Sequence, residues 1–305
     1  MSAPIYQLGE HHCDTLAATS QLATALTHCG SFTQALELHQ QAYDGLKDDC
    51  RSGDQAVLMA RHNLGMCLLE MCRFEEALVH YQRVLTDRTR IDGPDHPRTL
   101  RTMNNLVLCL KRLGRLEEAL PLSQRTLAVR KRTLGETHPD TLSAMHNHAQ
   151  MLGLMKRQAE AQVLYEQTLA IKRRMLGSEH PRTLNTLHNL GSTHFRQGRF
   201  EEAERINRNV LEIRRRVLGV RHPSTLRTQA NLGRTLMKQQ RLAEAEIQLQ
   251  ETWKLQASQR GETHSDTLST QRALTRCRVL VNRQPKTMFV GARGDETGAV
   301  GAIRE

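Results

Sequence analysis

The stretch from His96 to Gly135, HPRTLRTMNNLVLCLKRLGRLEEALPLSQRTLAVRKRTLG, decides the fold because most of the chain repeats it. Its opening motif HPRTL returns, with small changes, every 42 residues: at His138, His180, His222 and His264. The same register extends back to Asp54 and to His12. Self-similarity at one fixed period of 20–50 residues is typical of a solenoid. We therefore expect six repeats, followed by half of a seventh.

Each repeat carries two apolar stripes at helical spacing. In the third repeat the first stripe runs from Leu100 to Leu113, and the second begins at Leu116. Gly114 separates them, and glycine adopts the left-handed conformation at a helix C-terminus at low cost. A small residue recurs early in the second stripe and would let the two helices approach closely: Ala77, Ala119, Ala161, Ala203 and Ala245. The fold class is therefore all-α, built from stacked antiparallel helix pairs, here called helix A and helix B.

The ends of the chain and one loop depart from the pattern. We expect residues 12–282 to form the repeat array, with six helix pairs and a final single helix. Residues 1–11 resemble the end of a preceding repeat, or form an N-terminal extension, and the Gly-rich residues 283–305 are expected to be a disordered tail. In the fourth repeat Lys156 replaces the glycine between the helices, which predicts a local weakness.

The composition indicates a basic protein with few aromatic residues. The net charge is +11, aromatics make up 3%, and 35 of the 43 basic residues are Arg. This excess favours anionic partners. No apolar run reaches about 18 residues, and the N-terminus has no secretory pattern, so neither a membrane span nor secretion is expected. Seven Cys without a C-x-x-C motif suit free thiols in a reducing compartment, so we expect a cytoplasmic protein. The sequence does not indicate the oligomeric state.

Two motifs carry a resemblance to a known family. Asn189-Leu190-Gly191, followed by Gly198-Arg199-Phe200-Glu201-Glu202-Ala203-Glu204, resembles the tetratricopeptide repeat. The 42-residue period and the junction Leu-Gly-x-x-His-Pro-x-Thr-Leu are similar to repeats of the kinesin-light-chain type. The resemblance covers residues 8–282 and implies a right-handed α-solenoid whose helices A line a concave groove. The heptad coiled coil that joins kinesin light chains to heavy chains is absent from this sequence.

The resemblance places a recurring asparagine of the second to sixth repeats on the groove, with Asn104 beside it in the third. The candidate peptide-binding amides are Asn63, Asn104, Asn105, Asn147, Asn189 and Asn231. A primary amide offers a donor and an acceptor, so it can pair with the main chain of an extended peptide of any sequence. By resemblance, Asn105 has this role in related grooves. Alternatively, these side chains bond between neighbouring helices and only hold the array together, and the two roles are compatible.

Basic residues surround the asparagines at inward positions. Those we assign to peptide binding are Arg101, Lys111, Arg112, Arg196, Arg227, Arg234 and Lys238. Glu70 is the only acid at the inward positions, so the groove should favour carboxylates, which Arg can bind bidentately. The alternative is that the long basic side chains merely solvate an exposed wall.

Other basic or ligating residues are better explained structurally. Each helix B ends in a basic series, such as Arg130-Lys131-Arg132, that offsets the negative end of the helix dipole or forms a basic outer stripe. The junction histidines, one per repeat, are too far apart to share a metal ion and suit helix-entry hydrogen bonds. We find no catalytic set, no metal site and no cofactor motif.

The sequence therefore predicts a non-catalytic scaffold or adaptor that binds an extended, acidic peptide or protein segment. A first alternative is nucleic-acid binding through the basic surface, although few aromatics are available to stack bases. A second is a sensor or regulatory array from a larger signalling protein. A third is a purely structural spacer or oligomerisation surface.

Overall fold

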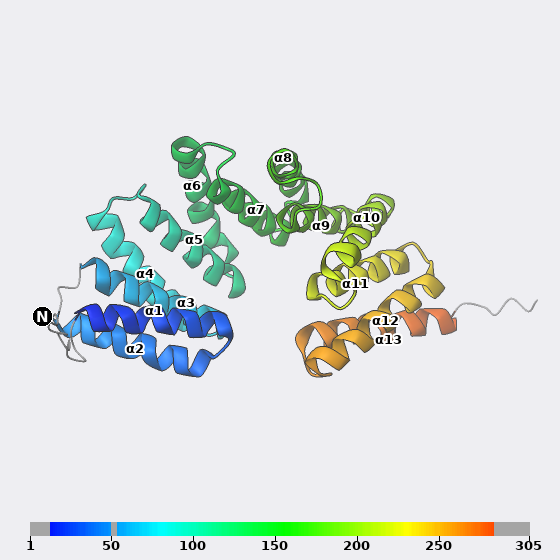
Figure 1. The fold of residues 1–305 in the computed structure, drawn as a ribbon. Helices are drawn as coiled ribbons and strands as arrows, with labels where there is room; N and C mark the ends of the chain where they lie inside the picture. Colours follow the sequence, from blue (N-terminus) through cyan, green and yellow to red (C-terminus); the bar gives the residue numbers. More distant parts are fainter. Residues whose placement is uncertain (1–12, 50–53, 284–305) are drawn as a thin grey trace, which may run out of the picture. The chain divides into compact units, whose positions relative to one another are not determined.

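The computed structural model describes residues 13–49 and 54–283, and within these ranges it contains thirteen α-helices and no strand (Figure 1). Helices A are α1 (Cys13–Cys29), α3 (Gln55–Glu70), α5 (Pro97–Arg112), α7 (Pro139–Leu154), α9 (Pro181–Arg196), α11 (Pro223–Lys238) and α13 (Ser265–Arg283). Helices B are α2 (Phe32–Asp49), α4 (Phe74–Ile91), α6 (Leu116–Leu134), α8 (Gln158–Leu176), α10 (Phe200–Leu218) and α12 (Leu242–Arg260). The all-α class is confirmed.

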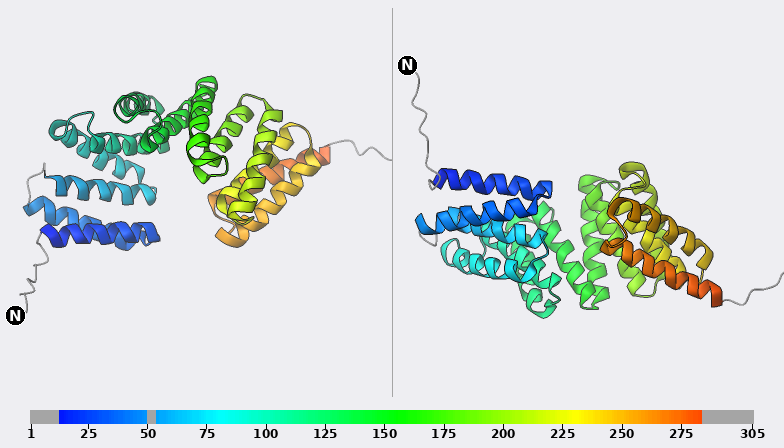
Figure 2. Two further views of the ribbon diagram at one scale, coloured as in Figure 1. Left: turned by 45° about the horizontal axis from the view of Figure 1, so that its top comes forward. Right: turned by 90° about the horizontal axis from the view of Figure 1, so that it is seen from below.

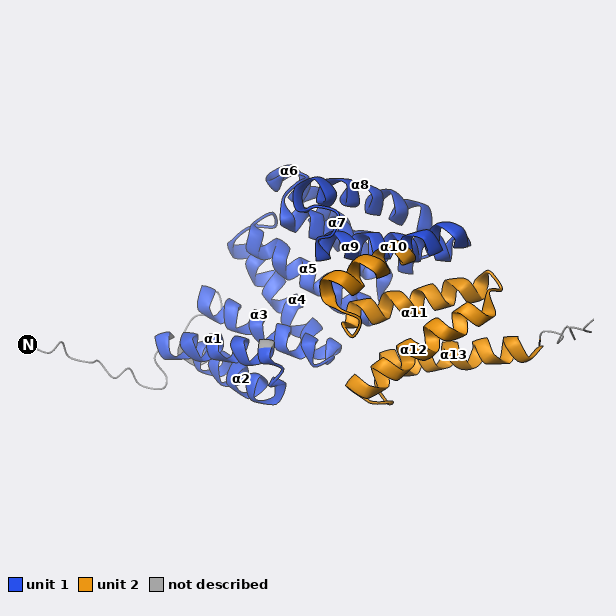
Figure 3. Cartoon of the chain, turned by 45° about the vertical axis from the view of Figure 1, so that its right-hand side comes forward, with its two compact units in different colours: residues 1–206 blue, residues 207–305 orange. Residues whose placement is uncertain are grey.

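The chain divides into two compact units, residues 1–206 and 207–305 (Figure 3). Unit 1 contains α1 to α9 and the start of α10, and unit 2 contains the rest of α10 and α11 to α13. The expected extension over residues 1–11, and the expected tail beyond Arg283, lie outside the described residues. A single array over 12–282 stays a prediction.

Successive helices pack against one another within each unit. Each of α1 to α8 contacts the next helix along the chain, and α1 to α4 lie side by side in three views (Figures 1 and 2). In unit 1 there are further contacts between α1 and α3, α3 and α5, and α7 and α9, all of them helices A. Helices A therefore form the more crowded side of unit 1.

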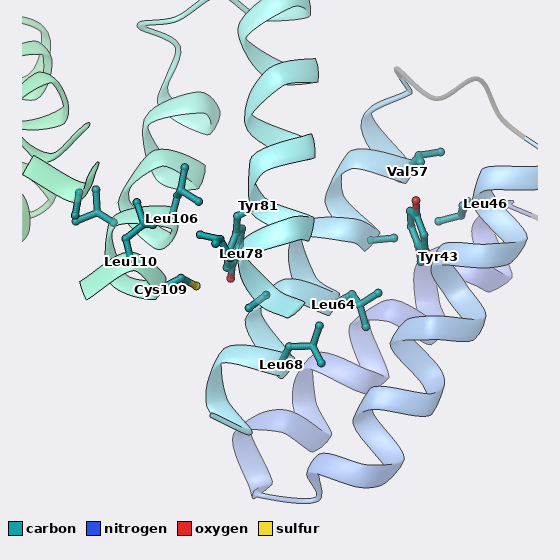
Figure 4. Packing of buried hydrophobic residues seen from close by; sticks show 14 of the residues in the cluster. Tyr43, Leu46, Val57, Leu64, Leu68, Leu78, Tyr81, Leu106, Cys109 and Leu110 are labelled. Atoms are coloured by element: carbon teal, nitrogen blue, oxygen red, sulfur yellow. The ribbon is translucent and has the colours of Figure 1, made fainter. Parts of the chain in front are cut away.

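Helices A and B approach closely because one of them carries a small side chain at each crossing. The five predicted alanines, and Ala35 in α2, are all 0% exposed. At another crossing Gly65 of α3 faces Tyr81 of α4, where an added Cβ would lie 3.2 Å from the ring. Figure 4 shows Tyr81 within the apolar cluster formed by side chains of α2, α3, α4 and α5.

The turns between helices A and B require a left-handed residue. Gly114 and Gly198 supply it with φ of 76° and 79°. Cys72, Lys156 and Gln240 adopt the same conformation, with φ between 61° and 63°, without being glycine. The turn therefore has the same conformation where glycine is replaced. At these three positions the Cβ atom strains the left-handed backbone.

Lys156→Gly is expected to raise the free energy of unfolding by about 1 kcal/mol, because it removes the steric cost of a left-handed non-glycine residue. Denaturant unfolding of the full chain measures the change. Gly114→Ala is the matched reverse substitution and should lower stability by a similar amount. Equal stability of Lys156→Gly and the parent chain would contradict this explanation of the turn.

A buried cation near the end of four of the six helices B, α4, α6, α8 and α10, ties each of them to the next helix A. The cations are Arg88, Arg130, Lys172 and Arg214, each 42 residues after the last and each at most 7% exposed. Arg88 Nη1 donates to the carbonyl of Arg98 (3.1 Å) and to Thr102 Oγ1 (2.6 Å). The first residue of each basic series is therefore buried, so the alternative of a basic outer stripe does not apply to it.

This contact between the buried cation of a helix B and the next helix A, here called the clamp, varies between repeats. Arg214 Nη1 donates to the carbonyl of Ser224 (2.9 Å) and to Thr228 Oγ1 (2.6 Å). Lys172 Nζ donates to Thr186 Oγ1 (3.0 Å), and burial followed by the nearby Arg182 charge lowers its pKa to about 8. A cavity of about 50 Å³ is lined by Lys172 and Arg182. The lysine thus fills less of the space that arginine fills in the other repeats.

Lys172→Arg is expected to stabilise unit 1 by about 1 kcal/mol, since filling a cavity of this size recovers roughly 24 cal/mol per Å³. The new guanidinium would also donate to the carbonyl of Arg182. Arg88, Arg130 and Arg214 each donate to the carbonyl at the equivalent position. Denaturant unfolding again measures the gain. The reverse change, Arg130→Lys, should cost stability, and a stabilising effect of Arg130→Lys would contradict the account.

Candidate functional site

The predicted asparagines of unit 1 form a ladder of hydrogen bonds between successive helices A. In each bond the asparagine Nδ2 lies near the side chain 43 residues earlier: Asn63 near Ser20 Oγ (3.3 Å), Asn105 near His62 Nε2 (3.3 Å), Asn147 near Asn104 Oδ1 (3.2 Å) and Asn189 near His146 Nε2 (3.1 Å). The expected helix-to-helix role is therefore observed, and the contact with a peptide stays a prediction.

The ladder leaves acceptor atoms available. Within the described residues, the Oδ1 atoms of Asn63, Asn105 and Asn147 accept no hydrogen bond, because every bond of these three amides uses Nδ2. All three side chains are partly exposed. They can therefore present a row of acceptors to the N–H groups of a ligand main chain while their donors keep the helices in register.

Two of the ladder sites are equivalent His–Tyr–Asn networks placed two repeats apart. His62, Tyr81 and Asn105 form the first, and the rings of His62 and Tyr81 meet edge to face with centroids 5.2 Å apart. His146 and Tyr165 repeat this contact at 5.6 Å beside Asn189. Burial is the main cause that lowers the pKa of His62 to about 3 and of His146 to about 4. Both imidazoles are therefore neutral at pH 7 and can accept from the asparagines.

The sequence reasoning missed these aromatic partners. The signal was a polar residue in five of the six helices B, at a fixed position among apolar neighbours: His39, Tyr81, Ser123, Tyr165 and Asn207. Most of them bond to a helix A, as Tyr81 does to Asn105 (3.3 Å) and Ser123 does to His148 (2.9 Å). A polar residue recurring on a buried stripe predicts an inter-helix network.

The structure brings four of the predicted site residues together in unit 1. Lys111 and Arg112 of α5, with Asn189 and Arg196 of α9, line one cavity of about 470 Å³. The remaining lining residues are Gln150, Leu154, Tyr165 and Ser192. We call this the α5–α9 pocket. None of its lining residues is acidic.

Helix α7 lies between α5 and α9 and accommodates the cations of both helices. Lys111 Nζ donates to Gln150 Oε1 on α7 (2.9 Å), and burial followed by the Arg112 charge lowers the pKa of Lys111 to about 8. From the other side Arg196 lies over Gly153, where an added Cβ would come 3.1 Å from Nη1. Glycine at this position therefore makes room for Arg196, and α5 and α9 both direct positive charge onto α7.

The other predicted basic residues lie elsewhere. Arg101 is exposed on α5, outside the lining of the pocket. Asn231, Arg227, Arg234 and Lys238 all belong to α11 in unit 2. Arg234 bonds to Asn231 Oδ1 (3.1 Å) and to Ser269 Oγ (3.0 Å), so it holds α11 against α13. Arg227 and Lys238 are exposed.

The junction histidines cap helices A, as expected. The Nδ1 of His138 accepts from the Asp140 N–H (3.1 Å), and the same bond recurs at His96, His180, His222 and His264. In the part of the chain that the structure describes, no three His, Cys, Asp or Glu side chains are grouped so that they could hold a metal ion. Within that same part, every helix is too short or too polar for a membrane span.

A family model described as tetratricopeptide repeat matches the chain in overlapping segments: residues 14–86, 56–131, 103–174, 159–214 and 182–256. Together these segments cover most of the sequence. A comparison with curated proteins finds no match.

Solved structures give the same result. A Podosopora anserina structure of kinesin-light-chain-like, nearly identical TPR-like repeats is 28% identical, with a TM-score of 0.57, and the match covers 67% of this chain and 97% of that one. The quorum sensor NprR from B. thuringiensis, in its apo form, is 13% identical with a TM-score of 0.66, covering 87% and 71%. NprR in complex with its cognate peptide NprX is 13% identical with a TM-score of 0.67, covering 92% and 76%. The two NprR structures show likeness of fold alone.

Proposed function

The chain belongs to the tetratricopeptide repeat family, and on that premise we propose that it is a non-catalytic scaffold whose helices A bind an extended, acidic segment of another protein. The observation that carries the proposal is the coincidence, on the crowded side of unit 1, of a row of amide acceptors with a cluster of cations. The amides suit a peptide main chain, and the cations suit acidic side chains.

The spacing of the amides suits a linear ligand. Packed helices lie about 8–10 Å apart, and an extended chain advances about 3.3–3.6 Å per residue. One asparagine therefore meets roughly every third residue of a ligand that crosses the helices A. NprR, which has a related fold, is seen with a peptide bound, and this lends support to a peptide ligand.

The surroundings of the ladder favour binding over chemistry. The buried imidazoles of His62 and His146 already accept from asparagines, and the charges of the α5–α9 pocket are all of one sign.

Among the cysteines, Cys29, Cys67, Cys72, Cys109 and Cys277 are free thiols, which supports a reducing compartment such as the cytoplasm.

Replacing Asn105, Asn147 and Asn189 together by Ala is expected to weaken binding of extended acidic peptides at least tenfold. Each lost hydrogen bond is worth about 0.5–1.5 kcal/mol, and 1.4 kcal/mol is a factor of about ten. Fluorescence polarisation with an acidic peptide pool measures the affinity, and thermal unfolding checks that the helices persist. The double variant Arg173→Gln, Arg174→Gln, on the exposed end of α8, is the control and should bind as the parent does. Unchanged affinity of a folded triple variant would refute the proposal.

A further inference from the structure

The cations of the α5–α9 pocket lack the partners that other arginines of this chain have. At the start of the helices B, Arg73, Arg115, Arg157 and Arg241 each bind a glutamate three residues later, at 2.6–2.7 Å. Within the described residues Arg112 and Arg196 form neither an ion pair nor a side-chain hydrogen bond, and Lys111 bonds only to the neutral Gln150. These four arginines are paired with carboxylates, whereas the cations of the α5–α9 pocket have no counter-charge among its lining residues.

The pocket is formed by a departure from the repeat. Arg112 and Arg196 occupy equivalent positions two repeats apart, and Leu154 occupies that position on α7 between them. Gly153 likewise stands where α5 has Lys111 and α9 has Phe195. Leu154 adds no charge and Gly153 adds no side chain, so the cations of both neighbouring helices share one cavity.

The charge and the donors of this cavity exceed what one carboxylate can use. Lys111, Arg112 and Arg196 line the cavity, and no lining residue carries a negative charge. A bound carboxylate would supply only one negative charge against these three positive charges. A phosphate monoester brings about −1.5 to −2 charges at pH 7 and three acceptor oxygens. Guanidinium groups match those oxygens in pairs, and a lysine ammonium adds a third, separate donor.

We propose that the α5–α9 pocket is a phosphate-binding subsite, with Lys111, Arg112 and Arg196 as its ligands. This deepens the proposed function and rests on it: the phosphate belongs to a phosphorylated serine or threonine within the acidic segment that crosses the helices A. Bound phosphate also relieves the repulsion that Arg112 exerts on Lys111. The half-exposed side chain of Leu154 beside the cations can contact an apolar neighbour of the phosphorylated residue.

The test compares three versions of one extended acidic peptide that carry serine, phosphoserine or a Glu-Glu pair at a central position. Isothermal titration uses the full chain and the double variant Arg112→Gln, Arg196→Gln. We expect phosphoserine to bind at least tenfold more tightly than serine, and more tightly than Glu-Glu, and this preference to disappear in the double variant. Arg173→Gln with Arg174→Gln removes the same charge from α8 and should keep the preference.

The outcomes separate the two proposals. If the serine and phosphoserine peptides bind equally well to the parent chain, the phosphate subsite is refuted and the peptide groove stands. If Glu-Glu equals phosphoserine, the pocket binds paired carboxylates and the subsite is again refuted. If no peptide binds, the proposed function fails, and with it the subsite in the form stated here. Inorganic phosphate titrated alone distinguishes a site for the free ion, since saturable binding without phosphopeptide binding would assign the pocket to free phosphate.

Discussion

Replacing Arg214 by alanine is expected to lower the free energy of unfolding of unit 2 by about 3 kcal/mol, a large effect for a single substitution. The side chain is 1% exposed and donates to Ser224 and Thr228 on the next helix. Alanine would leave both acceptors without this donor, at about 1–3 kcal/mol for each buried group, and would open a cavity.

Hydrogen exchange of the α11 amides measures this effect locally, because repeats unfold as semi-independent neighbours. Arg215→Ala is the matched control, since Arg215 is the adjacent and exposed member of the same basic series. It should change stability by less than about 0.5 kcal/mol. If the two variants lose the same stability, the clamp between helix B and the next helix A does not hold the repeats together.

Acid is expected to destabilise unit 1 well above the pH at which carboxylates titrate. The pKa of His39 is lowered from 6.5 to about 4 by burial, and those of His62 and His146 are also lowered, to about 3 and 4. Because these folded pKa values lie below the unfolded value, the unfolded state binds protons first as the pH falls. Stability is therefore retained above pH 6.5 and lost progressively between pH 6.5 and about 3.

His39→Leu isolates one of these groups. Its side chain is 0% exposed, neither ring nitrogen has a hydrogen-bond partner, and Leu249 occupies the equivalent position in α12. The lowering of the His39 pKa from 6.5 to about 4 corresponds to a loss of about 3 kcal/mol in the free energy of unfolding at pH 4. Denaturant unfolding at pH 7 and pH 4.5 should show a smaller loss for His39→Leu than for the parent chain. Parallel losses would show that His39 contributes nothing to the acid sensitivity.

The repeat architecture could be predicted because each of its requirements recurs every 42 residues. The glycines at the turns, the alanines at the helix crossings and the histidine caps all perform the expected roles. Each of these roles depends on local geometry, so a single repeat already contains the information. Repetition then separates the pattern from chance.

The buried clamp could not be predicted from the same pattern because long cations suit both an exposed helix end and a buried contact. Arg130 and Lys131 are neighbours in one basic series, yet the first is 6% exposed and the second bonds to Glu136 at the surface. The distinguishing signal was a threonine fourteen residues after three of the cations, as Thr228 follows Arg214.

The α5–α9 pocket was only partly predictable. Lys111, Arg112, Asn189 and Arg196 are each predicted as inward residues, but their convergence depends on Gly153, whose missing side chain leaves room for Arg196. Arg234 is likewise predicted as a ligand-binding residue, and in the structure it bonds to Asn231 and Ser269 within unit 2. Which basic residues already have partners is a property of side-chain packing, and the sequence alone does not reveal it.

The most direct test of the central claim is a selection from a random-peptide display library on the full chain, run beside single-stranded RNA at two salt concentrations. We predict enrichment of acidic, extended peptides that is lost in the triple variant of Asn105, Asn147 and Asn189. RNA retention that falls steeply with added salt, without any peptide enrichment, would contradict the claim and assign the basic surface to nucleic acid.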